Sequence, residues 1–209
     1  MLMLGRYKDS MDAMNRAFYT VALLAAGGGS KMVEMCETIG IPTTPETLKE
    51  ASKRPLIVFD IDDTLLRNDS SIIPDVFLLY KKLRALGART FLVTARRASM
   101  RNFTVDELNK AGIEFERENL FICPENYRSS MTSVSQWKAL MRRNIAFKYG
   151  APISLSVGDQ WGDITELDND YEIDYLDEAY GVKHKPFLLM RIGDARGATC
   201  VGLKLPSSD

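Results

Sequence analysis

The chain has 209 residues, which is enough for one domain with a sizeable core but short for two. Hydrophobic residues make up 45% of it and charged residues 26%, which excludes disordered, collagen-like and coiled-coil proteins. The 27 basic and 28 acidic residues give a net charge of −1, so no overall positive charge attracts duplex nucleic acid or an anionic membrane.

Cysteine and histidine are scarce, and this restricts the possible chemistry. The three cysteines lie far apart, which excludes a disulfide framework and a CxxC zinc cluster and favours a reducing, cytoplasmic location. His184 is the only histidine, so a site that needs two imidazoles is excluded. Carboxylates must therefore carry most of any catalysis.

Residues 1–54 are predicted to form an α-helical N-terminal extension. Apolar residues recur at three- and four-residue steps from Met11 to Ala25, as in an amphipathic helix that packs on a domain. The apolar stretch 17–29 has the character of a signal-peptide core, but Asp9 and Asp12 precede it and it is too short to cross a bilayer. We therefore expect no membrane association, and a secreted form with a long leader is the alternative.

Residues 55–209 alternate between strand and helix patterns and are predicted to form one α/β domain. We expect strands at 56–60, 89–94, 120–123, 153–157 and 187–192, and helices at 74–86, 99–111 and 133–149. Strands separated by helices of this length form right-handed crossovers. The pattern therefore predicts a doubly wound parallel sheet of Rossmann-like type.

In such a sheet, ligands bind beyond the carboxyl ends of the strands. Asp60 and Asp62 follow the first predicted strand, and Asp159 and Asp163 follow the strand at 153–157. Two carboxylates in close contact repel by about 4 kcal/mol at an effective dielectric constant of 20, so a cation is expected among these four. Oxygen ligands without imidazole or thiolate favour a hard ion, Mg²⁺ rather than Ca²⁺.

Two further residues are expected at the same edge. Thr94 ends the second predicted strand, and Lys138 lies on the helix before the strand at 153–157. Lys138 is the first basic residue of that helix, and Arg142 and Arg143 are the alternatives for the cationic position. A trianionic substrate group fits between such a lysine and a bound dication.

Four motifs in this order resemble those of the haloacid dehalogenase-like (HAD) hydrolases. Asp60-Ile-Asp-Asp-Thr64 matches the DxDx[TV] signature, Thr94 and Lys138 occupy the second and third motifs, and Gly158 to Asp163 resembles the acidic fourth motif. The first motif and the Thr94-Ala-Arg96 triplet are closest to the acid-phosphatase-like branch, subfamily III. The resemblance extends from about residue 56 to residue 192.

The resemblance implies a mechanism for phosphomonoester hydrolysis. Asp60 would attack phosphorus and form an aspartyl-phosphate. Asp62 would protonate the leaving oxygen and then activate a water molecule. Thr94, Arg96 and Lys138 would bind the substrate, with Thr94 and Lys138 stabilising the phosphoryl group.

The resemblance also implies a set of metal ligands. Asp60, Asp159 and the backbone carbonyl of Asp62 would hold Mg²⁺. Asp163 would orient Lys138 or a metal-bound water.

The spacing of the motifs limits the size of any insertion that could cover the site. Only 33 residues separate Asp60 from Thr94, and 43 separate Thr94 from Lys138, so no large cap domain is expected. The site should be open unless the N-terminal extension or a second subunit of a homo-oligomer covers it. Nine acidic residues between Asp159 and Glu178 should repel duplex nucleic acid.

The sequence thus predicts a Mg²⁺-dependent phosphatase that acts on a phosphorylated small molecule such as a nucleotide. A polynucleotide-end or phosphoprotein phosphatase is one alternative. A non-catalytic storage or binding protein of the same fold is another.

Overall fold

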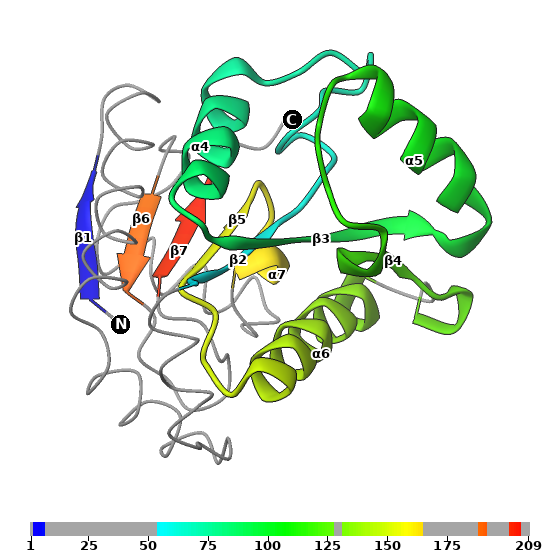
Figure 1. The fold of residues 1–209 in the computed structure, drawn as a ribbon. Coiled ribbons are helices and arrows are strands. Elements are labelled where there is room, and N and C mark those ends of the chain that lie inside the picture. Colours follow the sequence, from blue (N-terminus) through cyan, green and yellow to red (C-terminus); the bar gives the residue numbers. More distant parts are fainter. Residues whose placement is uncertain (1, 7–53, 128–130, 165–187, 192–200, 206–209) are drawn as a thin grey trace.

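The structure is a computed structural model that describes residues 2–6, 54–127, 131–164, 188–191 and 201–205 (Figure 1). These residues form one seven-stranded sheet with the order β1-β6-β7-β5-β2-β3-β4. The strands are β1 (Leu2–Arg6), β2 (Leu56–Phe59), β3 (Arg89–Arg97), β4 (Leu120–Cys123), β5 (Leu155–Gly158), β6 (Leu188–Arg191) and β7 (Val201–Lys204).

Five neighbouring strands, β7, β5, β2, β3 and β4, are parallel, which confirms the predicted α/β fold. The chain starts in the middle of this part at β2, runs outward to β4, and returns past β2 to β5. That reversal places the end of β2 at the switch point, where doubly wound sheets bind ligands. Phe59, the last residue of β2, pairs with Leu92 of β3 and Val157 of β5.

Two further strands extend the sheet beyond β7 with antiparallel pairing. β6 runs antiparallel to β7, and β1 runs antiparallel to β6. The strand at 187–192 was predicted as part of the parallel sheet, but β6 is antiparallel to its neighbours, and β7 and β1 were not predicted at all. Residues 2–6 therefore form a strand where a helical extension was expected, and the predicted helix at 11–25 lies outside the described residues.

Helices cover both faces of the sheet (Figure 1). α4 (Pro74–Ala85) and α5 (Arg101–Lys110) lie on one side, and α6 (Met131–Tyr149) lies on the other. A fourth, short helix, α7 (Trp161–Ile164), follows β5.

The buried residues of β2 alternate between these two layers. Phe59 belongs to the core cluster that contains Leu79 of α4, whereas Val58 belongs to the cluster that contains Trp137 of α6. Alternation of this kind follows from the two-residue repeat of a strand. The central strand is therefore apolar on both faces, and polar side chains appear only where it ends.

The described residues contain no cap domain. Those between Asp60 and Thr94 form a loop, α4 and the start of β3, and those between Thr94 and Lys138 form α5, β4 and the first part of α6. No helix in the described part of the chain is both long and apolar enough to cross a membrane.

Glycines end the three long helices. Gly87 follows α4, Gly112 follows α5 and Gly150 follows α6, and each has a positive φ. A residue with a Cβ is strained in this left-handed conformation.

Gly112 isolates the cost of this conformation, because nothing lies within 4 Å of the Cβ that a substitution would add there. We expect Gly112→Ala to lower the free energy of unfolding by about 1 kcal/mol, and Gly112→Asn to lower it by less, because asparagine tolerates positive φ. Urea denaturation measures both. Equal losses for the two variants would show that φ is not the cause.

Candidate active site

Parallel strands bring the predicted residues to one edge of the sheet. Asp60 follows β2, and its backbone N–H donates a 3.0 Å hydrogen bond to the carbonyl of Val157 in β5. Asp159 and α7 follow β5 at the same edge. A pocket of about 170 Å³ opens there, and its lining includes Asp60, Asp62, Lys138, Asp159 and Asp163.

Three of the four predicted carboxylates form a cluster. Asp60, Asp159 and Asp163 each offer an oxygen, and these oxygens all lie within 4.8 Å of one another. All three residues are buried, with 5% or less of their surface exposed. Buried carboxylates so close together repel strongly, and a cation relieves that repulsion.

Lys138 provides part of the positive charge. From α6, its Nζ donates a 3.0 Å hydrogen bond to Oδ1 of Asp60 and a second bond to Oδ1 of Asp163. Lys138 is also buried, with 5% of its surface exposed. When ionised, the three carboxylates and this ammonium together carry two net negative charges, which a divalent cation would balance.

Burial and mutual repulsion shift pKa values within the cluster. Burial raises the pKa of Asp60 well above its usual value, although Lys138 opposes this. Burial, and secondly the charge of Asp163, raise the pKa of Asp159 to about 6. Burial would lower the pKa of Lys138, but Asp163 and Asp60 raise it above its usual value. The protein alone therefore favours protons in this pocket, as expected where a bound cation completes the charge balance.

Asp62 lines the pocket, but its carboxylate is directed elsewhere. Nη2 of Arg96 donates to Oδ1 of Asp62 over 2.7 Å, and Nε donates to the same carboxylate. Of the four carboxylates expected around one cation, three therefore lie together, and that of Asp62 does not join them. Any contribution of Asp62 to a metal site falls to its backbone carbonyl, because its side chain is paired with Arg96.

Thr94 of β3 and Asp63 of the turn after β2 lie next to Asp62. The hydroxyl of Thr94 donates to Oδ2 of Asp62 over 3.4 Å, and it accepts the backbone N–H of Arg96 over 3.2 Å. Asp63 adopts a φ of 51°, which Asp tolerates better than most residues. Asp63 is thus a turn residue after β2.

The structure also distinguishes Lys138 from the two arginines on the same helix. Arg142 lies one turn beyond Lys138 and is buried, but its Nη1 donates to the carbonyls of Gly162 and Asp163 over 2.8 and 2.9 Å. Arg143 is exposed. Lys138 is therefore the basic residue of α6 that reaches the carboxylates, while Arg142 holds the backbone of α7.

Two glycines allow α7 to approach the site closely. A Cβ at Gly158 would lie 2.1 Å from Cβ of Asp163, and one at Gly162 would lie 2.3 Å from Oγ of Ser135. Gly158 was part of the predicted fourth motif. The packing roles of Gly162 and Arg142 were not predicted, because they depend on contacts between α6 and α7.

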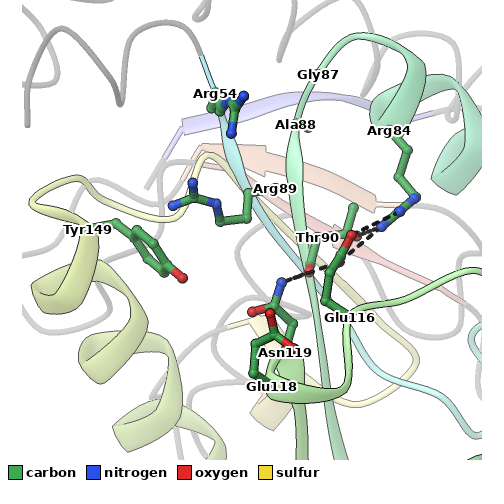
Figure 2. Close-up of a pocket in the computed structure, with 10 residues that line it drawn as sticks. All are labelled: Arg54, Arg84, Gly87, Ala88, Arg89, Thr90, Glu116, Glu118, Asn119 and Tyr149. Carbon is green, nitrogen blue, oxygen red and sulfur yellow. Dashed lines mark hydrogen bonds and ion pairs between the residues drawn. The ribbon is translucent and has the colours of Figure 1, made fainter.

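A second pocket lies at the opposite edge of the sheet, around the start of β3 (Figure 2). It has a volume of about 370 Å³ and contains none of the predicted site residues. Its best-defined ion pair joins Arg84 to Glu116 over 3.1 Å, and the Glu116 side chain is 45% exposed. This distant pair provides a control for substitutions at the site.

The sheet order and the acidic pocket at its switch point are those of a doubly wound α/β protein that binds its ligand beyond the strand ends. The family model described as HAD superfamily, subfamily IIIB (acid phosphatase), matches residues 67–183. This span includes Thr94, Lys138, Asp159 and Asp163 and begins just after Asp60 and Asp62. Comparison with curated protein sequences gives no significant match.

Two solved structures share the fold. A class C acid phosphatase from Bacillus anthracis is 13% identical, with a TM-score of 0.52 over 94% of this chain and 85% of that chain. A structure of class C acid phosphatase from Bacillus anthracis with tungstate bound is also 13% identical, with a TM-score of 0.56 over 96% of this chain and 79% of that chain.

The chain belongs to subfamily IIIB of the HAD superfamily, the acid phosphatases. It is therefore a phosphomonoester hydrolase.

The charge cluster predicts a specific pH dependence of stability. Asp159 has a pKa of about 6 in the folded protein against a usual value of 3.8, so the folded state binds a proton more tightly than the unfolded state. Its ionised form destabilises the fold above pH 6, and this effect fades as the pH falls toward 3.8. With EDTA present, we expect Asp159→Asn to be more stable than the wild type at pH 7.5, with a smaller difference at pH 4.5.

Urea denaturation at the two pH values measures this difference. A variant that is less stable than the wild type at pH 7.5 in EDTA would contradict the assigned repulsion. Asp106→Asn, which removes an exposed carboxylate from α5, is the control and should change stability little at either pH.

Proposed function

We propose that the protein is a Mg²⁺-dependent phosphatase that acts through an aspartyl-phosphate on a phosphorylated small molecule such as a nucleotide. The observation that carries this proposal is the buried contact of Lys138 with Asp60 and Asp163 inside the carboxylate cluster. This contact supports the proposal because one pocket would then hold the carboxylate nucleophile, a fixed positive charge and oxygen ligands for a dication.

The donor set fits Mg²⁺. Asp60, Asp159 and the backbone carbonyl of Asp62 would hold the ion, and they offer only oxygen. The ion would reduce the repulsion between the Asp60 carboxylate and the negatively charged phosphate. Asp163 would act mainly through Lys138, since one of its oxygens accepts the lysine bond and the other accepts the backbone N–H of Gln160 over 2.9 Å.

The reaction would proceed in two displacements. An oxygen of Asp60 forms a bond to phosphorus while the ester oxygen leaves with a proton from Asp62. Asp62 then takes a proton from water, which attacks the aspartyl-phosphate and releases phosphate and the free Asp60 carboxylate. Lys138 would stabilise negative charge on the phosphoryl oxygens in both steps.

Thr94 and Arg96 have different proposed roles. The Thr94 hydroxyl makes only a long bond to Asp62, so it would turn to donate to a phosphoryl oxygen when substrate binds. Arg96 was predicted to bind substrate directly. Its contacts with Asp62 and with Glu107 of α5 favour a role in positioning Asp62 instead.

The pocket is small, and the site around it is open. Its volume of about 170 Å³ accommodates the phosphoryl group, and the described residues provide no cap over it. Such a site admits a small phosphomonoester, our first candidate, and also a phosphoprotein or polynucleotide end, the alternative. The cytoplasmic location and the homo-oligomer stay predictions.

Comparing turnover of a 5′-nucleotide, a phosphorylated peptide and a 3′-phosphorylated oligonucleotide tests the substrate class. We expect the nucleotide to have the highest kcat/KM. A higher value for the peptide or the oligonucleotide would replace the small-molecule proposal with the corresponding alternative.

Asp60→Asn tests the nucleophile. We expect it to lower Mg²⁺-dependent hydrolysis of p-nitrophenyl phosphate by about a thousandfold or more, because the amide cannot form the acyl-phosphate. Asp106→Asn should keep full activity. Undiminished turnover by Asp60→Asn would exclude Asp60 as the nucleophile, and absence of turnover in the wild type would favour a binding protein.

Lys138→Met tests the assignment of the cation. Because Lys138 contacts Asp60 directly, we expect this variant to lose about a hundredfold or more in kcat, with Arg143→Met close to wild type. Steady-state kinetics with p-nitrophenyl phosphate measure both. Comparable losses in the two variants would show that the fixed charge beside Asp60 is not specific to Lys138.

A further inference from the structure

A chain of four polar side chains begins and ends on the loop that follows β2. From Ser70, Oγ donates to Oε1 of Glu107, and Oε2 of Glu107 accepts Nη1 of Arg96. Nε and Nη2 of Arg96 then donate to Asp62. These hydrogen-bonded side chains thus link two points of one loop through α5 and the end of β3.

Burial makes the middle of this chain rigid. The side chain of Arg96 is 8% exposed and that of Glu107 is 10% exposed, whereas that of Asp62 is 45% exposed. Nη1 of Arg96 also donates to Oγ1 of Thr104 over 3.3 Å, which further fixes the guanidinium plane on α5. A planar guanidinium held on one side orients the carboxylate that it binds on the other.

Glu107 binds Nη1 of Arg96, on the side of the guanidinium away from Asp62. Without its negative charge, the buried guanidinium keeps Asp62 as its only ion-pair partner among the described contacts. A buried charge that loses a partner moves to recover solvent or another acceptor. Loss of the Glu107 charge should therefore displace Arg96, and with it the carboxylate of Asp62.

We propose that Glu107 is a positioning residue that sets the direction of the Asp62 carboxylate through Arg96, and thereby supports proton transfer to the leaving group. This inference rests on the proposed function, in which Asp62 is the general acid. Glu107 lies on α5, outside the four sequence motifs, and contacts none of the metal-cluster carboxylates in the hydrogen bonds described for it.

The leaving group provides the decisive measurement. An alkoxide needs a proton to depart, whereas p-nitrophenolate leaves readily without one, so impaired acid catalysis penalises alkyl phosphates selectively. The ratio of kcat/KM for glycerol 1-phosphate to that for p-nitrophenyl phosphate isolates this effect. It reports the first phosphoryl transfer only, so the later hydrolysis of the aspartyl-phosphate does not enter it.

Glu107→Gln is the test variant, assayed with saturating Mg²⁺. We expect kcat/KM for glycerol 1-phosphate to fall by about tenfold or more, because general acid catalysis contributes at least that much. We expect kcat/KM for p-nitrophenyl phosphate to fall by less than about threefold. Ser70→Ala, at the exposed end of this hydrogen-bonded series, should change the ratio in the same direction by a smaller factor. Glu116→Gln, which removes a charge from the distant Arg84 pair, should leave the ratio unchanged.

The outcomes separate the two proposals. Equal loss of activity toward both esters in Glu107→Gln would overturn the positioning role. If Glu107→Gln does not fold, an unchanged kcat/KM ratio in Ser70→Ala would overturn it. A wild type without Mg²⁺-dependent turnover of either ester would overturn the proposed function itself. In a double variant with Arg96→Ala, the ratio should change no further than in Arg96→Ala alone, because both residues act through one contact.

Discussion

The buried ammonium of Lys138 lies between the carboxylates of Asp60 and Asp163, and the acidic site is organised around this contact. A lysine loses much hydration energy on burial, so its position is tolerable only beside several negative charges. One ammonium does not neutralise three carboxylates. The remaining negative charge is the physical reason that we propose a divalent cation for this pocket.

The backbone around the cluster is arranged to keep these charges together. Gly158 and Gly162 allow α7 to approach β5 and α6, and Arg142 holds α7 by two of its carbonyls. α6 thus supplies two cations one turn apart with separate tasks: Lys138 contacts side chains, and Arg142 contacts the backbone. An array of charges that repel one another costs stability, and the apolar core on both faces of β2 offsets that cost.

Much of this arrangement could be predicted from sequence, because strand ends in a parallel sheet share an edge. The apolar runs before Asp60, Thr94 and Asp159 were sufficient to place those residues at one edge. The choice of Lys138 over Arg142 and Arg143 needed the contacts of α6. The direction of the Asp62 carboxylate was not predictable, since it depends on Arg96 and on Glu107 far along the chain. β7, which lies between β6 and β5, was missed because a glycine interrupts its short apolar pattern.

A crystal structure of the protein grown with Mn²⁺ in place of Mg²⁺ tests the central claim most directly, because anomalous scattering locates the ion without assumptions about its ligands. The account predicts one strong peak about 2.0–2.3 Å from carboxylate oxygens of Asp60 and Asp159, with Lys138 still bonded to Asp163. A fully occupied ion elsewhere, or no ion in this pocket at saturating Mn²⁺, would contradict it.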